Sequence, residues 1–113
     1  MQSTGGCLTT GALRKIPVQM IESGPAAGVL AAAYIGCLTG RPQVISFDMG
    51  GTTAKAGIIE RGEPRIVSRF QAGEWLLSMP ALDLVEIGSG GGSIAWIDKS
   101  GMLAGTAMSP QYV

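Results

Sequence analysis

The residue types best suited to chemistry are concentrated in one short stretch. It contains an aspartate, two glycines and two threonines: Asp48, Gly50, Gly51, Thr52 and Thr53. Glycines lack a Cβ atom, so successive backbone N–H groups can approach a phosphate closely, and threonine hydroxyls add donors. A carboxylate beside a phosphate is repelled unless a divalent cation lies between them, and Mg²⁺ is the natural mediator. The stretch therefore predicts a phosphate-binding turn with Asp48 as the metal ligand.

The same residues also fit an ordinary β-hairpin, because aspartate and glycine are common in turns. What favours the functional interpretation is the segment before them. The run Ala26–Leu38 is small and apolar on nearly every face, which predicts a helix buried on more than one side. Gln43–Phe47 then predicts a buried strand leading directly into Asp48.

A second glycine cluster and a lysine leave alternatives open. The cluster contains Gly90, Gly91, Gly92 and Ser93, and it fits contact with nucleotide, contact with a neighbouring loop, or a flexible turn. Lys55 follows the first turn closely enough to reach a phosphate oxygen. An ordinary solvated lysine is the interpretation we favour for it.

The composition excludes several classes of protein. With 113 residues, 46% of them apolar, the chain is long enough for one domain with a core. Eight basic residues balance eight acidic ones, which argues against a sequence-independent nucleic-acid binder. Because histidine is absent, a Ser-His-Asp site or a histidine-ligated metal within this chain is excluded.

Cysteine usage and hydropathy predict a cytoplasmic protein without a membrane partner. Cys7 and Cys37 are expected to be free thiols, buried or partly buried, in a reducing compartment. The amino-terminal residues lack the basic and apolar regions of a signal peptide. The apolar run Ala26–Leu38 is shorter than the ~20 residues that a membrane-spanning helix needs.

Turn and capping residues predict the remaining elements. Ser23 is expected to cap the alanine-rich helix and Gly40 to end it. From Thr106 onward no pattern continues. The other expected elements are a short helix at Thr9–Lys15, a short strand at Val18–Ile21, an antiparallel meander of Gln43–Phe47, Ala54–Ile59 and Arg65–Phe70, and a hairpin of Ile94–Ile97 with Met102–Ala104.

Four motifs, in this order, resemble the hydantoinase A / 5-oxoprolinase family (N-methylhydantoinase A-like). They are Met1–Gly6, Ser23–Val29, Phe47–Lys55 and Glu86–Asp98, and the resemblance covers nearly the whole chain, to about Gly105. It implies an α/β fold, a partial lobe of an actin-like/sugar-kinase-like (ribonuclease H-like) ATPase, with antiparallel hairpins and a buried alanine-rich helix. It also implies the cofactors ATP and Mg²⁺.

The resemblance assigns roles to the two glycine stretches. Gly50, Gly51, Thr52 and Thr53 become phosphate contacts of the second phosphate hairpin of a two-lobed ATPase, with Asp48 at Mg²⁺. Gly90, Gly91, Gly92 and Ser93 become further nucleotide contacts. Many members have an acidic residue where this chain has Lys55, and the tail 106–113 diverges from the family pattern. We expect residues 1–113 to form a single partial domain, cut at both ends from a larger protein.

The function implied is that of an ATP-dependent hydrolase of cyclic amides or imides, to which this chain supplies one phosphate hairpin. Its catalytic residues are unknown, and whether the chain alone is an enzyme is left open. The alternatives are an inert truncated lobe or docking subunit, and an acetone-carboxylase-like subunit. The partners implied are the remaining lobe or a hydantoinase B-like subunit. With half a cleft and one sheet face uncovered, the purified chain should show weak or no Mg²⁺-dependent ATP turnover.

Overall fold

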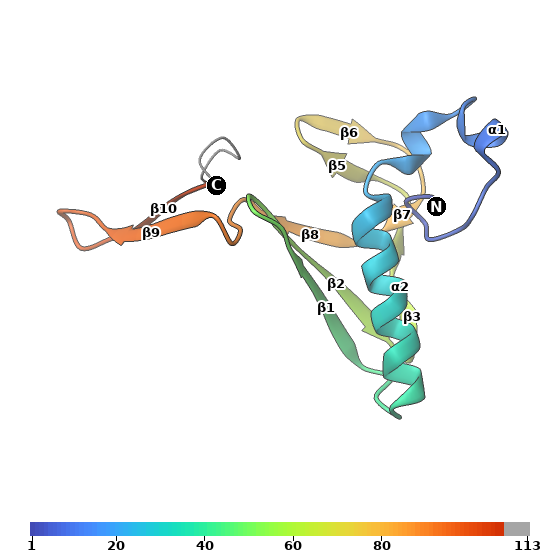
Figure 1. Ribbon diagram of the computed structural model, residues 1–113, viewed down its shortest axis with the longest axis horizontal. Coiled ribbons are helices and arrows are strands. Elements are labelled where there is room, and N and C mark those ends of the chain that lie inside the picture. Colours follow the sequence, from blue (N-terminus) through green and yellow to red (C-terminus); the bar gives the residue numbers. More distant parts are fainter. Residues whose placement is uncertain (108–113) are drawn as a thin grey trace.

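A computed structural model describes residues 1–107 as an α/β body from which a β-hairpin projects (Figure 1). The helices are α1 (Thr10–Leu13), the 3-10 helix η1 (Pro17–Met20) and α2 (Ser23–Leu38). The strands are β1 (Val44–Met49), β2 (Ala54–Glu60), β3 (Glu63–Pro64), β4 (Ile66–Val67), β5 (Phe70–Ala72), β6 (Trp75–Leu77), β7 (Ala81–Leu82), β8 (Leu84–Ile87), β9 (Ser93–Ile97) and β10 (Leu103–Ala107).

Helix α2 is the longest element, and its end is set by local sequence. The Gly40 N–H donates to the Cys37 carbonyl and the Arg41 N–H to the Gly36 carbonyl, the pair of bonds that defines a Schellman motif. Gly40 has φ +68°, as that motif requires, so the predicted end is confirmed. The predicted cap at Ser23 is wrong, because the helix begins at Ser23 and the N-cap position is occupied by Glu22.

Only one stripe of α2 is buried within the described residues. Ala26, Val29, Ala33 and Gly36 recur at helical spacing and face the sheet. On the other side Tyr34, Ile35 and Leu38 are exposed. The expectation of a helix buried on several sides is therefore wrong for residues 1–107, because a single sheet packs against it.

The central sheet has strand β2 in its middle. Strand β1 pairs with β2 from Val44↔Ile59 to Met49↔Ala54, and β8 pairs with the other side of β2 from Gly57↔Leu84 to Ala54↔Ile87, both antiparallel. The predicted third strand at Arg65–Phe70 is wrong. Its residues are divided between β4, which pairs with β7, and β5, which pairs with β6.

The core lies between α2 and one face of this sheet (Figure 1). Its buried members are Ala26, Val29, Ala33, Ile59 and Leu82. The opposite sheet face carries exposed apolar side chains from all three long strands. They are Ile45, Phe47 and Met49 of β1, Ile58 of β2, and Val85 and Ile87 of β8. One face of the sheet is thus uncovered within the described residues, as the sequence predicted.

The amino-terminal segment is fixed to the body through Ser3, which is almost fully buried. Its hydroxyl donates to the carbonyls of Gln19 and Ile21, and its own carbonyl accepts the Leu82 N–H at 2.9 Å. These bonds join the chain before α1, the turn before α2, and β7. The predicted strand at Val18–Ile21 is wrong, since η1 occupies most of it after Pro17.

The remaining expectations concern the carboxyl-terminal hairpin and tail, the two cysteines and membrane-spanning helices. The projecting β9–β10 hairpin was predicted, but β10 continues through Ala107, so regular pairing extends past the predicted end at Ala104. Residues 108–113 of the predicted divergent tail lie outside the described part. Cys7 and Cys37 are free, as expected, but both are exposed rather than buried. No helix in residues 1–107 is long and apolar enough to cross a membrane.

Candidate phosphate-binding site

The predicted phosphate turn is the loop that joins β1 to β2. The ladder between these strands ends at the pair Met49↔Ala54, so Asp48 lies inside β1 rather than in the turn. The turn itself contains Gly50, Gly51, Thr52 and Thr53, and it is closed by the Gly50 N–H donating to the Thr53 carbonyl at 2.9 Å. Asp48 is thereby held on a regular strand, separated from the loop by Met49.

The loop presents backbone donors that the protein does not use. The N–H groups of Gly51, Thr52 and Thr53 make no hydrogen bond to any of residues 1–107. The Gly50 N–H, by contrast, is engaged in closing the turn. A partly exposed loop with successive free N–H groups is the kind of structure that binds anionic oxygen atoms. Because the Gly50 N–H is engaged in the turn, Gly50 would have to contact a phosphate through another of its atoms.

The second glycine cluster packs directly on this loop. The Gly91 N–H donates to the Gly50 carbonyl at 2.9 Å, and the Gly92 N–H donates to the Gly51 carbonyl at 2.8 Å. The Gly90 N–H donates to the Ser93 hydroxyl at 2.9 Å. Of the alternatives left open by the sequence, contact with a neighbouring loop is therefore what the structure describes. A nucleotide contact by Gly90–Ser93 stays a prediction.

Gly90 is the point of closest approach between the two loops. A Cβ atom at this position would lie 2.6 Å from the Gly50 oxygen, the Gly51 carbon and the Thr52 nitrogen, all of them backbone atoms. No side chain is compatible with that distance unless the backbone shifts. Because Gly90 lacks a Cβ atom, the second loop can pack closely against the first.

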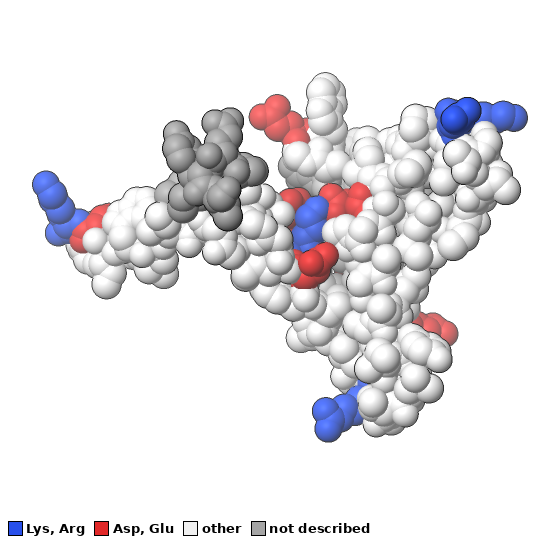
Figure 2. Space-filling view, viewed as in Figure 1, with Lys and Arg blue, Asp and Glu red and all other residues white. Residues whose placement is uncertain are grey.

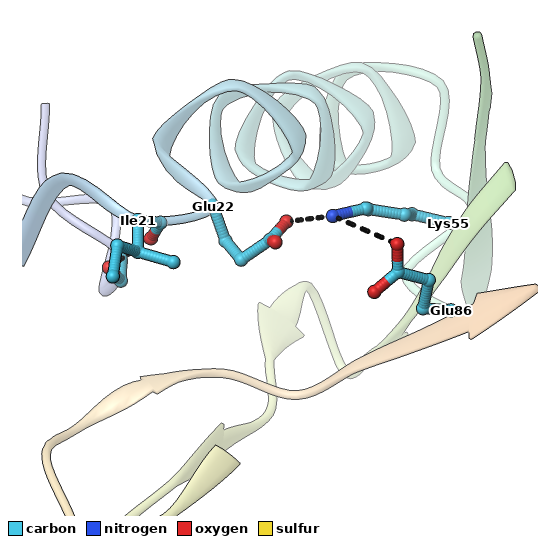
Figure 3. Close-up of polar contacts among 5 residues, drawn as sticks. Ile21, Glu22, Lys55 and Glu86 are labelled. Carbon is cyan, nitrogen blue, oxygen red and sulfur yellow. Dashed lines mark hydrogen bonds and ion pairs between the residues drawn. The ribbon is translucent and has the colours of Figure 1, made fainter. Parts of the chain in front are cut away.

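Beside the loop, a row of charged side chains crosses the sheet. Asp48 pairs in register with Lys55, and Lys55 pairs with Glu86 on β8, so the three residues lie on one sheet face. The Lys55 ammonium forms an ion pair with Glu22, just before α2, and lies 3.7 Å from the Glu86 carboxylate (Figure 3). In Figure 2 both signs of charge meet near the centre of the molecule, where β2 and β8 approach the beginning of α2.

The expectation of a solvated Lys55 is wrong. Its side chain is only 15% exposed, and it has two carboxylate partners. Sequence reasoning did not single out Glu22 or Glu86 individually, because both lie far from Lys55 along the chain and only the fold brings them together. Glu22 has the αL conformation, with φ +65°.

Asp48 is the candidate ligand of a divalent cation beside the loop. No ion pair described for residues 1–107 involves Asp48, and its carboxylate belongs to an exposed residue beside the free N–H groups. No group of three or more His, Cys, Asp or Glu side chains in those residues is arranged to hold a metal by itself. Mg²⁺ usually takes one or two protein carboxylates, with water and substrate phosphates completing its shell. A lone Asp48 therefore fits Mg²⁺ that arrives with a phosphate.

Among residues 1–107, the ionisable group with a shifted pKa is the carboxyl of Asp98, in the β9–β10 turn. The Asp98 carboxylate accepts hydrogen bonds from the Ser100 hydroxyl at 2.6 Å, the Ser100 N–H at 2.8 Å and the Met102 N–H at 3.0 Å. The Ser100 hydroxyl is the largest contribution that lowers the pKa of Asp98. These bonds stabilise the predicted turn and lie apart from the candidate site.

Sheet, helix and paired glycine loops together define a partial α/β lobe of the ATPase type. The hydantoinase/oxoprolinase family model matches residues 1–108 of the chain. The chain belongs to the hydantoinase/oxoprolinase family. The resemblance noted from the four motifs is thereby confirmed.

Individual relatives agree with this membership. The chain is 38% identical to an uncharacterized protein of Methanocaldococcus jannaschii, covering 91% of this chain and 17% of the relative. It is 32% identical to the caprolactamase subunit alpha of Pseudomonas jessenii, covering 90% of this chain and 15% of the relative. The chain thus spans less than a fifth of the length of these relatives.

A solved structure shows the same fold. The nucleotide-free structure of acetone carboxylase, described as an enzyme of ATP-dependent acetone carboxylation, matches with a TM-score of 0.78 and 29% identity. The match covers 96% of this chain and 15% of that chain. The expected fold class, α/β with antiparallel hairpins, is therefore confirmed.

Proposed function

We propose that the β1–β2 loop binds the terminal phosphates of ATP and that Asp48 is the ligand of the accompanying Mg²⁺. The observation that supports this most directly is the combination of free N–H groups at Gly51, Thr52 and Thr53 with an unpaired carboxylate at the adjacent strand end. Neither feature alone distinguishes a phosphate site from an ordinary turn. Their juxtaposition provides donors for phosphate oxygens and a negative group for a cation.

Each residue of the loop has a defined task in this proposal. The free N–H groups donate to phosphate oxygens and orient the phosphate chain, while the Thr52 and Thr53 hydroxyls supply further donors. Asp48 would hold Mg²⁺, which neutralises charge on the phosphates when it is bound. The second glycine loop keeps the first in place through its bonds to Gly50 and Gly51. The contribution to catalysis is positioning and electrostatic stabilisation.

For a full-length member of the family, we propose ATP-dependent hydrolysis of a cyclic amide. ATP transfers its terminal phosphoryl group to the amide oxygen. Water then attacks the activated carbon, and the ring C–N bond breaks as the nitrogen takes up a proton. The acyl phosphate that results is hydrolysed by a second water to a carboxylate and phosphate. The relative named caprolactamase subunit alpha supports a cyclic amide substrate and a further subunit as partner. We propose a cytoplasmic location for this activity, because ATP is available there.

A second candidate activity is carboxylation. It is favoured by the structural match to acetone carboxylase, at a TM-score of 0.78. The phosphate loop would have the same task in either reaction, since both consume ATP. The two are separated by adding a lactam, or bicarbonate with a ketone, to a full-length homologue and measuring which one stimulates ATP hydrolysis.

Binding of a non-hydrolysable ATP analogue by this chain tests the role of the loop. We expect Mg²⁺ to tighten binding to the native chain, and Asp48→Ala to remove that gain. The loss should be about tenfold or more, since hydrogen bonds and contacts of charged groups contribute about 1.5–3 kcal/mol. Calorimetric titration with and without Mg²⁺ measures it. Glu74→Ala, an exposed acidic residue in the β5–β6 turn, is the matched control. Equal Mg²⁺ dependence in native protein and Asp48→Ala would refute the assignment.

A further inference from the structure

The register of the sheet would by default pair Asp48 with Lys55. The two residues are direct cross-strand partners on the same sheet face, where opposite charges attract each other across about 5 Å between Cβ atoms. Both also line one hollow of about 240 Å³ between α2 and the sheet, so the two residues border the same space. An Asp48–Lys55 ion pair would place a positive charge where the proposed cation binds.

The structure shows a different pairing. The Lys55 ammonium forms its ion pairs with Glu22 and Glu86 (Figure 3). These three residues are among those that line a second hollow. The Glu22 side chain is 19% exposed and that of Glu86 is 45% exposed. The reduced solvent access of Lys55 and Glu22 makes their attraction stronger than that of an exposed pair. Two carboxylates therefore compete with Asp48 for one ammonium.

The position of Glu22 is maintained by its backbone. Its φ of +65° is uncommon for a residue with a Cβ atom and costs about 1 kcal/mol or more. The carbonyl of Glu22 accepts the Ala26 N–H in the first turn of α2, and the preceding Ile21 carbonyl accepts the hydroxyl of buried Ser3. Such a conformation persists because contacts on both sides determine it. In this conformation Glu22 reaches Lys55.

We propose that Glu22 and Glu86 are positioning residues that hold the Lys55 ammonium away from Asp48, so that the Asp48 carboxylate stays available to a divalent cation. This inference rests on the proposed function of Asp48. Without the two glutamates, Lys55 turns to its cross-strand partner and competes with the cation. Binding of the cation should then weaken although Asp48 itself is intact.

The test is a cycle of substitutions read by NMR on the whole chain. Mn²⁺ stands in for Mg²⁺, because both prefer oxygen ligands and Mn²⁺ broadens nearby amide signals. The quantity measured is the Mn²⁺ concentration that half-broadens the amide signals of Gly51 and Thr52. The variants are Glu22→Gln/Glu86→Gln, Lys55→Met, all three together, and Asp48→Asn. A salt concentration of about 0.15 M screens exposed charges that lie more than ~8 Å apart.

The expected result is strong coupling between the glutamates and Lys55. Glu22→Gln/Glu86→Gln should raise the half-broadening concentration about tenfold, and adding Lys55→Met should restore it. In the native background Lys55→Met alone should change it by less than about threefold, since Lys55 is already occupied there. If Lys55→Met has the same effect in the native chain and in Glu22→Gln/Glu86→Gln, the lysine charge acts on cation binding independently of the glutamates. The proposal is then overturned. An unchanged value in Glu22→Gln/Glu86→Gln overturns it as well.

Asp48→Asn separates this inference from the function on which it rests. If Asp48→Asn leaves the broadening of the loop unchanged, Asp48 is not the cation ligand and both proposals fall. If Asp48→Asn abolishes the broadening while the glutamates show no coupling to Lys55, only the positioning role falls. Dispersed amide signals establish that each variant is folded. Should the double glutamine variant not fold, Glu22→Gln and Glu86→Gln are each measured with and without Lys55→Met. A larger effect of Lys55→Met in these variants than in the native chain supports the proposal, and an equal effect overturns it.

Discussion

Gly90→Ala should displace the loop between β1 and β2 and lower the free energy of unfolding by about 1–3 kcal/mol, as overpacking of a closed contact does. The added Cβ atom would meet three backbone atoms of the loop at 2.6 Å. Backbone atoms cannot turn away as a flexible side chain can. The two loops must therefore separate, which breaks the bonds from Gly91 and Gly92 to the carbonyls of Gly50 and Gly51.

Gly88→Ala is the matched control for this substitution. Gly88 lies in the same loop, but a Cβ atom there has nothing within 4 Å, and its φ is not positive. Chemical denaturation measures the change in stability, and amide chemical shifts of Gly50–Thr53 report whether the loop has moved. Binding of the ATP analogue should weaken in Gly90→Ala and stay unchanged in Gly88→Ala. Equal shifts and equal stability in the two variants would show that the docking of the loops is not close.

Two glycines within α2 should respond in opposite directions to the same change. At Gly36 a Cβ atom would lie 2.7 Å from both the Arg41 carbonyl oxygen and the Val44 side chain, where the helix packs on β1. Gly36→Ala should therefore cost about 1–3 kcal/mol of unfolding free energy. At Gly28 a Cβ atom meets nothing within 4 Å, so Gly28→Ala should stabilise the helix by up to about 1 kcal/mol.

Thermal or urea unfolding followed by circular dichroism gives both values on one scale. Because the two substitutions add the same methyl group to the same helix, their helix propensity gain is the same and only the surroundings differ. A Gly36→Ala variant as stable as Gly28→Ala would mean that α2 does not approach β1 as closely as described. The difference between the two variants is therefore a direct measure of that packing.

The sequence alone located the elements whose signals are local. The hairpin of β1 and β2 was predicted because an apolar strand, a pair of glycines and a second strand follow one another within a few residues. The end of α2 was predicted because Gly40 supplies the positive φ that a Schellman motif needs. The prediction was wrong where the local pattern covered only a few residues. Arg65–Phe70 alternates like one strand, yet β4 and β5 divide it because each finds a different partner.

Only the tertiary structure decided how these parts cooperate, because the deciding contacts join residues far apart in the chain. Pairing of β8 with β2 brings Glu86 to Lys55, and the turn before α2 brings Glu22 to the same ammonium. The docking of Gly90 on the first loop likewise depends on where β8 ends. Residue types thus determined that a glycine turn and a neighbouring carboxylate exist here, as a phosphate site would need. The register of the sheet and the packing of α2 determined which charges face one another, since a cross-strand neighbour is fixed by pairing and not by sequence distance.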